Sequence, residues 1–164
     1  IVRPARRTTQ ADPPAGSGGA RSDRGTARRR ADVRDDDHAV APAGLAAEPA
    51  LHARDADPAG FDWIVGNDAE NSVFAYARYG EGRAAPCVVL LNMTPEPRHG
   101  YAVGLPRAGQ WREVLNSDAE IYGGGNIGNG GMVTASTTPL HRQPSRATVV
   151  LPPLGAVILR FEGA

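Results

Sequence analysis

A cluster of glycines in the second half of the chain restricts the folds that this sequence can adopt more than any other feature. Six of the nine residues 123–131 are glycine, and no packed helix tolerates so many, because glycine lacks a Cβ atom and favours backbone angles that other residues avoid. Just before this cluster, residues 111–115 alternate with a period of two, which is typical of a strand. We therefore predict a long, shaped loop that is carried on a β scaffold.

The aromatic residues divide the chain into two parts. All nine of them lie at or after Phe61, and the first sixty residues have none. A core needs large side chains, because each one that is buried contributes roughly 1.5–3 kcal/mol. We therefore expect the folded domain to be built from residues 61–164.

The first part of the chain lacks the pattern of a packed core. Residues 1–47 are rich in arginine, aspartate, alanine, proline and glycine, without periodic apolar spacing. We predict that they are disordered, since they cannot offset an ordering cost of about 1–2 kcal/mol per residue. Residues 48–60, which Pro49, Pro58 and Gly60 interrupt, form a linker in our interpretation.

Short apolar runs, separated by turn residues, fill the rest of the chain and predict strands. The run at residues 87–91 has no polar alternation, as expected of a central strand that is covered on both faces. In chain order, the predicted strands are residues 61–65, 73–79, 87–93, 101–105, 111–115, 132–135, 147–151 and 156–161. Many short strands at this spacing predict an all-β fold, an antiparallel β-sandwich or barrel.

The composition argues against several classes of partner. Eighteen basic and eighteen acidic residues give a formal charge of zero, so no global field directs the chain to nucleic acid or to a membrane surface. No apolar run reaches the length of about 18 residues that a membrane span needs. The single cysteine, Cys87, lies in an apolar run, which predicts a buried thiol, no internal disulfide and a cytoplasmic location.

We predict no catalytic residue, no metal site and no cofactor site in this chain. Asp118 and Glu120 lie two residues apart, and a pair of carboxylates could act on a glycosidic bond, but residues 116–118 more simply cap a turn. The acidic cluster at residues 35–38 has the composition of a metal site. Adjacent side chains diverge in most backbones, however, and no second group of ligands is near.

Four residues are candidate contacts to a glucan or to another domain: Trp111, Tyr122, Asn126 and Asn129. An aromatic ring can stack on a sugar ring, and an amide can hydrogen-bond its hydroxyl groups. In the alternative interpretation, Trp111 belongs to the core and the asparagines accept left-handed backbone angles in the loop. The sequence leaves both interpretations open and favours the alternative.

Six segments, in a fixed order from Glu48 onward, carry a resemblance to one known family. They are residues 49–52 (PALH), 60–64 (GFDWI), 92–98 (NMTPEPR), 111–118 (WREVLNSD), 122–129 (YGGGNIGN) and 151–156 (LPPLGA). Together they resemble the C-terminal end of bacterial 1,4-α-glucan (glycogen) branching enzymes. Several separate motifs in the same order make this resemblance far more specific than one short motif.

The resemblance implies the all-β C-terminal domain of the α-amylase superfamily, a β-sandwich that packs on a catalytic (β/α)8 barrel. The intact enzyme would cut an α-1,4-glucan and reattach the piece through an α-1,6 bond in glycogen biosynthesis, with an aspartate nucleophile and a glutamate acid/base. Those carboxylates belong to barrel segments that this sequence does not contain. We therefore expect a supporting domain that is inactive alone, with the missing barrel as its partner and α-glucan as a further ligand.

The resemblance ends abruptly at Glu48. In the family, a helix that ends the barrel should precede this residue, but residues 39–47 carry no amphipathic pattern. Our hypothesis is that residues 1–47 are translated out of frame or come from a misassembled gene, and we expect a chain that begins at Ile1 to be a fragment. The alternative function is a free-standing glucan-binding β-sandwich without catalysis.

Overall fold

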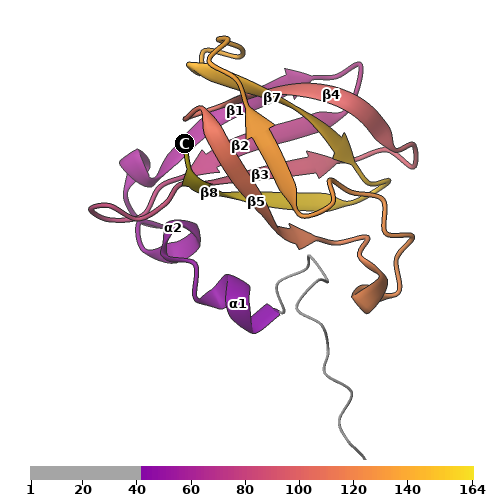
Figure 1. The fold of residues 1–164 in the computed structure, drawn as a ribbon, viewed down its shortest axis with the longest axis horizontal. Helices are drawn as coiled ribbons and strands as arrows, with labels where there is room; N and C mark the ends of the chain where they lie inside the picture. The colour runs from indigo at the N-terminus through magenta and orange to yellow at the C-terminus, as the bar shows by residue number, and fades with distance from the viewer. Residues whose placement is uncertain (1–41) are drawn as a thin grey trace, which may run out of the picture. The chain divides into compact units, whose positions relative to one another are not determined.

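Eight strands and four short helical segments make up residues 42–164, the part of the chain that the computed structural model describes (Figure 1). The helical segments are α1 (Pro42–Ala46), α2 (Pro49–His52), η1 (Pro58–Gly60) and η2 (Glu120–Tyr122). The strands are β1 (Phe61–Asp68), β2 (Val73–Arg78), β3 (Cys87–Asn92), β4 (Arg98–Leu105), β5 (Gly109–Asn116), β6 (Met132–Ala135), β7 (Ser145–Leu151) and β8 (Ala156–Gly163). None of the described helices has the length and hydrophobicity that crossing a membrane requires.

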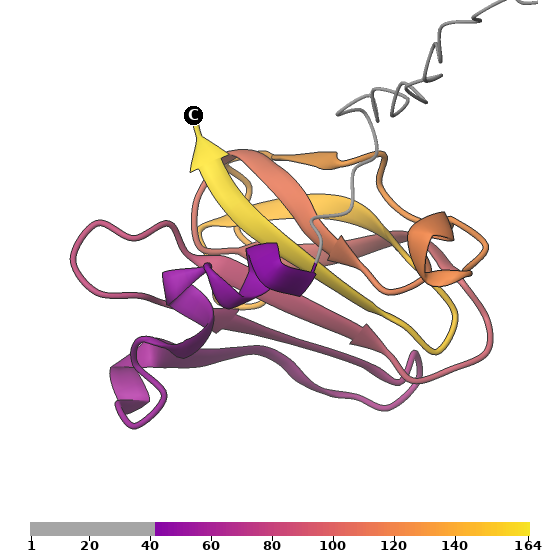
Figure 2. The same ribbon diagram turned by 90° about the horizontal axis from the view of Figure 1, so that it is seen from below.

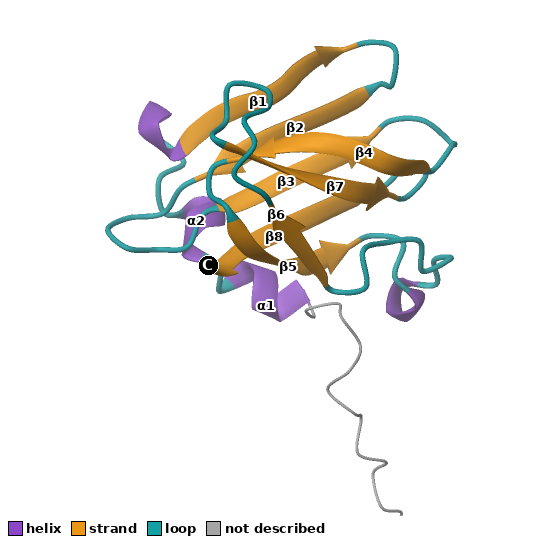
Figure 3. Cartoon of the chain, turned by 45° about the horizontal axis from the view of Figure 1, so that its top comes forward, coloured by secondary structure: helices purple, strands orange, loops and turns teal. Residues whose placement is uncertain are grey.

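The strands form two antiparallel sheets. One sheet has six strands in the order β1-β2-β3-β8-β5-β6, and the other pairs β4 with β7 (Figure 3). The buried apolar side chains of both sheets form one core cluster between them. This arrangement confirms the all-β, antiparallel β-sandwich that the sequence predicts.

Alternation along the strands determines which side chains face this core. Val73, Ala75 and Ala77 of β2 are fully buried, whereas the side chains between them are partly exposed. β7 repeats the pattern with Ala147 and Val149. Because successive side chains of a strand point to opposite faces, each strand contributes one apolar row to the space between the sheets.

Trp111 of β5 is the largest of the fully buried side chains that the structure describes. Its ring lies edge-on to Phe161 of β8 at a centroid distance of 5.3 Å. Its indole N–H donates to the carbonyl of Arg107 at 3.0 Å, which satisfies the one polar atom that the ring buries. Trp111 thereby packs β5, β8 and the turn before β5 together.

β1 is longer than the sequence predicts. It continues through Gly66 to Asp68, where a turn is expected. Register shifts between Trp63 and Val65, and again between Val65 and Asp68, mark irregularities in its pairing with β2. Such bulges bend a strand and let it stay paired, so the turn signal at Gly66 produces a bent strand instead of a strand end.

The disordered segment predicted for residues 1–47 lies mostly outside the described residues. Its last residues form α1, where the sequence predicts no helix. Local hydrogen bonds explain this difference, because the N–H of Ala47 donates to the carbonyl of Gly44 at 3.2 Å and that of Glu48 to Leu45 at 3.0 Å. The domain boundary near residue 48 stays a prediction.

Charged side chains attach the linker to the six-stranded sheet. Arg160 of β8 donates to the carboxylate of Glu48 at 2.7 Å, and Arg78 of β2 forms an ion pair with Asp55. Arg78 also donates to the carbonyl of Leu51 at 3.3 Å. These contacts hold α2 against the sheet at the end where β1 begins.

The turn before β7 uses backbone angles that are rare for non-glycine residues. His141 and Arg142 have φ of 50° and 61°, and Leu140 pairs with Gln143 across them. The Nδ1 atom of His141 accepts the N–H of Gly104 at 3.3 Å. Only the neutral imidazole can accept this bond, and burial lowers the pKa of His141.

Replacing Trp111 with alanine should lower the free energy of unfolding by about 3–5 kcal/mol, because the change leaves a large cavity in the core. Chemical denaturation followed by circular dichroism measures this loss. Trp63→Ala is the matched control, since Trp63 is 48% exposed, and it should cost clearly less. Equal losses for the two variants would contradict the placement of Trp111 in the core.

His141 should make stability depend on pH. Its pKa is lower in the folded protein than the ordinary value of 6.5, so its contribution is complete above that value and is lost as the pH falls toward the folded pKa. Thermal melts from about pH 7.5 to about pH 5 should therefore show a larger loss for the parent chain than for His141→Asn, which accepts a hydrogen bond but does not titrate. Parallel curves for the two proteins would refute this role of His141.

Candidate functional site

The glycine loop, residues 117–131, connects β5 to β6 and folds around one carboxylate. The two oxygens of Asp118 accept the N–H groups of Gly125 and Ile127, each at 3.0 Å. A Cβ atom at Gly124 would lie 2.2 Å from the carbonyl oxygen of Asp118, so the loop can close only with glycine at this position. The loop therefore has one defined shape.

A buried amide fastens the base of the glycine loop. Asn116, the last residue of β5, is 3% exposed. Its Nδ2 donates to the carbonyl of Ile127 at 3.0 Å, and its Oδ1 accepts the N–H of Asp118 at 3.0 Å. A Cβ atom at Gly128 would lie 2.2 Å from Nδ2, which explains why glycine stands there. The amide thus ties both arms of the loop to β5.

A buried carboxylate and a second amide connect the glycine loop to both sheets. Glu113 of β5 is 3% exposed and accepts the backbone N–H of Asn129 at 3.0 Å and its side-chain amide at 2.6 Å. The Asn129 amide also donates to the carbonyl of Val150 at 3.0 Å and accepts the N–H of Val150 at 2.7 Å. Because Val150 belongs to β7, Asn129 joins the six-stranded sheet to the two-stranded one.

The structure separates the four candidate contact residues. Trp111 is fully buried and the amide of Asn129 is engaged within the fold, so a sugar contact through Trp111 does not agree with the structure. The alternation of β5 turns Trp111 to the inner face, which confirms the core interpretation for this residue. Tyr122 is 40% exposed. Asn126 is exposed with φ of 59°, the left-handed angle that the alternative interpretation predicts for both asparagines, but Asn129 does not have a positive φ, so this prediction is wrong for Asn129.

Asp118 stabilises the fold of the glycine loop. Asp118 uses both oxygens to accept loop N–H groups, so the structure supports the turn-capping interpretation. Within residues 42–164, no three His, Cys, Asp or Glu side chains come together as metal ligands. The acidic cluster at residues 35–38 lies outside the described residues. Cys87 is fully buried, and burial raises the pKa of its thiol to about 12, as expected for an unreactive cysteine.

A second hydrogen-bonded group fixes the end of β1. Asp68 accepts the hydroxyl of Tyr101 at 2.8 Å and the side-chain amide of Asn71 at 3.0 Å. Burial acts to raise the pKa of Asp68, but these hydrogen bonds outweigh it and lower the pKa. Burial, together with the nearby Asp68 charge, raises the pKa of Tyr101. The pair therefore keeps β1 and β4 joined with a charged carboxylate and a neutral phenol.

An aromatic cluster, which the sequence analysis did not identify, lies on the outward face of β1 and β2. It consists of Phe61, Trp63, Phe74 and Tyr76. The rings of Phe61 and Tyr76 stack with centroids 5.1 Å apart, and Trp63 lies edge-on to Tyr76 at 5.8 Å. The sequence carries a signal for this cluster. Residues 61 and 63 are both aromatic, and so are residues 74 and 76. Residues two positions apart in a strand point to the same face of the sheet.

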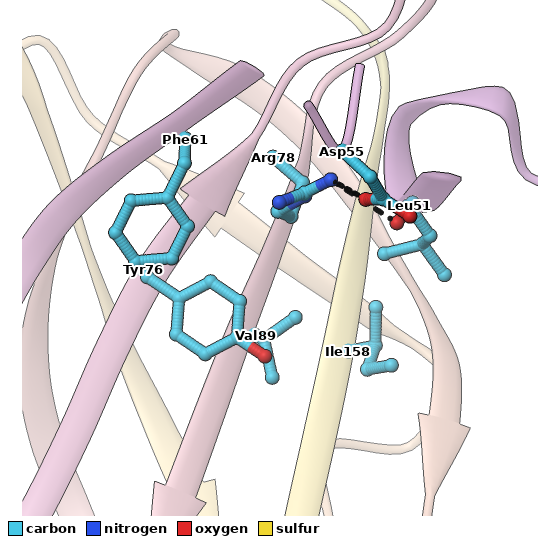
Figure 4. A pocket seen from close by; sticks show the side chains of 7 residues that line it. All are labelled: Leu51, Asp55, Phe61, Tyr76, Arg78, Val89 and Ile158. Atoms are coloured by element: carbon cyan, nitrogen blue, oxygen red, sulfur yellow. Dashed lines mark hydrogen bonds and ion pairs between the residues drawn. The ribbon is translucent and has the colours of Figure 1, made fainter. Parts of the chain in front are cut away.

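A pocket of about 280 Å³ adjoins the aromatic cluster and α2 (Figure 4). Its lining consists of Leu51, Asp55, Phe61, Tyr76, Arg78, Val89 and Ile158. The ion pair between Arg78 and Asp55 lies on one side, and the rest of the lining is mostly apolar. The Nε atom of Arg78 is buried and finds no hydrogen-bond partner among the described residues.

The two packed antiparallel sheets and the glycine loop define an all-β domain. The family model of the alpha amylase C-terminal all-beta domain matches residues 63–162. The chain belongs to this family, and the match agrees with the fold class that the strand pattern predicts.

The chain is also similar to several bacterial branching enzymes. It is 56% identical to 1,4-alpha-glucan branching enzyme GlgB 2 of Xanthomonas oryzae pv. oryzae (strain MAFF 311018) over 115 residues, which are 70% of this chain and 16% of that enzyme. It is 53% identical to GlgB of Pseudomonas syringae pv. tomato over 113 residues, 69% of this chain and 15% of that enzyme. The resemblance drawn from the six sequence segments is confirmed, and the matched region spans about a sixth of these relatives.

Asn129→Ala should lower the free energy of unfolding by about 1–3 kcal/mol, because it leaves the buried Glu113 carboxylate and the backbone of Val150 without their amide partner. Thermal and chemical denaturation measure this loss. Asn126→Gly is the matched control in the same loop, since glycine adopts the φ of 59° without strain. A loss for the control as large as that for Asn129→Ala would count against the bridging role of Asn129.

Proposed function

We propose that this chain carries the C-terminal domain of a bacterial 1,4-α-glucan branching enzyme, which acts in glycogen biosynthesis through a separate catalytic (β/α)8 barrel. The observation that carries the proposal is the 56% identity to a branching enzyme over 115 residues, together with the family match over residues 63–162. The matched region is a small part of such an enzyme, so branching activity belongs to the complete polypeptide.

In this proposal the domain supports the barrel and takes no part in the chemistry. Its most shielded carboxylates, Glu48 and Glu113, are bound to Arg160 and Asn129 within the fold. Asp118 is likewise engaged by loop N–H groups. Carboxylates that hold a fold together in this way are poor candidates for a nucleophile or a general acid. The chain by itself is therefore inactive, and the unpaired buried thiol suits a cytoplasmic enzyme.

A second candidate function is direct contact with α-glucan through the aromatic cluster. Trp63 is 48% exposed and is held edge-on by Tyr76, so its ring is both accessible and fixed in orientation. A flat, fixed aromatic ring on a surface is suited to stacking on a sugar ring. Tyr122 and Asn126, on the outside of the glycine loop, are further candidates for such contact.

A chimera tests the supporting role. In it, the 115-residue segment of this chain that matches the Xanthomonas oryzae GlgB 2 relative replaces the corresponding segment of that enzyme. The chimera should branch amylose, measured as new α-1,6 linkages after debranching, and the relative without the segment should lose activity. The 164-residue chain alone should show none. Branching by the chain alone, or a folded chimera without activity, would contradict the proposal.

Affinity electrophoresis of the 164-residue chain in gels that contain glycogen tests the second candidate. Retardation that Trp63→Ala removes, and that Leu154→Ala leaves in place, would support glucan contact at the aromatic cluster. Leu154 is the matched control because it is 70% exposed in a different loop. Equal migration of all three proteins with and without glycogen would exclude this second function.

A further inference from the structure

The outward face of the six-stranded sheet carries four aliphatic side chains, which we call the aliphatic belt: Val89 and Leu91 of β3, Leu115 of β5 and Ile158 of β8. The strand register places Ile158 beside both Val89 and Leu115. Leu91, Leu115 and Ile158 are each partly exposed. A strand face that meets water is normally polar, so an aliphatic row in this position indicates a surface that is covered in the working protein.

The outward face of the other sheet has a different character. On β7, Arg146 and Thr148 are exposed, while Ala147 and Val149 between and after them are buried. This is the ordinary pattern of apolar side chains inward and polar side chains outward. The aliphatic belt is therefore not a general property of the two outer faces of this sandwich.

One end of the aliphatic belt already contacts the linker. Leu51 of α2 lines the pocket together with Val89 and Ile158 (Figure 4). Glu48 pairs with Arg160, which lies on the same face of β8 as Ile158. Figure 2 shows α1 and α2 together on the near side of the six-stranded sheet. The linker that begins at Glu48 therefore lies along the face that carries the belt.

The length of the relatives indicates which part of the enzyme lies against this face. The matched region covers 16% of the Xanthomonas oryzae enzyme, and the family model describes a C-terminal domain, so most of such an enzyme precedes it. We propose that the aliphatic belt is the surface on which the catalytic domain of the branching enzyme packs. This inference rests on the proposed function and adds to it the face and the side chains of the contact.

The test is a double substitution, Leu115→Arg with Ile158→Glu, made in the chimera and in the 164-residue chain. These residues are cross-strand neighbours, so opposite charges at the two positions pair in water and keep the isolated chain folded. Inside an interface the same charges lose their hydration. Branching activity of the chimera should fall at least about tenfold. Thr148→Glu, on the outward face of β7, is the matched control and should leave activity within about twofold.

Each outcome decides the inference. A doubly substituted chimera as active as its parent would overturn the aliphatic belt as the docking surface and leave the proposed function standing. A parent chimera that folds but has no branching activity would contradict the proposed function, and this inference would fail with it. If the isolated chain with both substitutions unfolds, Leu91→Asn takes its place and must reduce chimera activity more than Thr148→Glu does. A dimer of the 164-residue chain that the double substitution separates, with the chimera unaffected, would assign the belt to a second copy instead.

Discussion

Hydrogen bonds from buried or partly buried side-chain amides to the backbone are the interaction on which the rest of this structure depends. Loop N–H and C=O groups have no ladder partners, and leaving one buried and unpaired costs about 1–3 kcal/mol. Asn92, Asn116 and Asn129 each donate to at least one backbone carbonyl and accept a backbone N–H. Each amide therefore fixes a loop against a strand. Asn129 does so between the two sheets and holds the sandwich closed at the glycine loop.

A domain fixed in this way presents defined outer surfaces. Its outward six-stranded face divides into the aromatic cluster on β1 and β2 and the aliphatic belt on β3, β8 and β5. The first presents a fixed and accessible ring, and the second presents side chains that water solvates poorly. This division agrees with the two proposals above. The aliphatic belt would contact the catalytic domain, and the aromatic cluster would stay accessible to an α-glucan.

The fold could be predicted because its signals are local. Strand alternation, turn residues and the glycine cluster are all properties of neighbouring residues, and the six family segments placed them in one architecture. The role of Asn129 could not be predicted from local signals, because its amide reaches Val150, which is 21 positions away in the other sheet. Trp111 was ambiguous because a period of two identifies a strand but not its inner face. The aromatic cluster needed the β1–β2 register, which the irregularities at Val65 conceal.

Amide hydrogen exchange of the 164-residue chain, followed by nuclear magnetic resonance, tests most directly whether the domain is a preformed scaffold. The N–H groups of Ile127 and Asn129 lie in the glycine loop and donate to the carboxylates of Asp118 and Glu113. If these bonds hold the loop without any partner, both amides should exchange nearly as slowly as the amides of β3, which lies between β2 and β8 within the six-stranded sheet; we expect the rates to agree within about tenfold. Exchange at the rate of an unprotected loop would show that the scaffold forms only in a larger assembly, and would contradict this account.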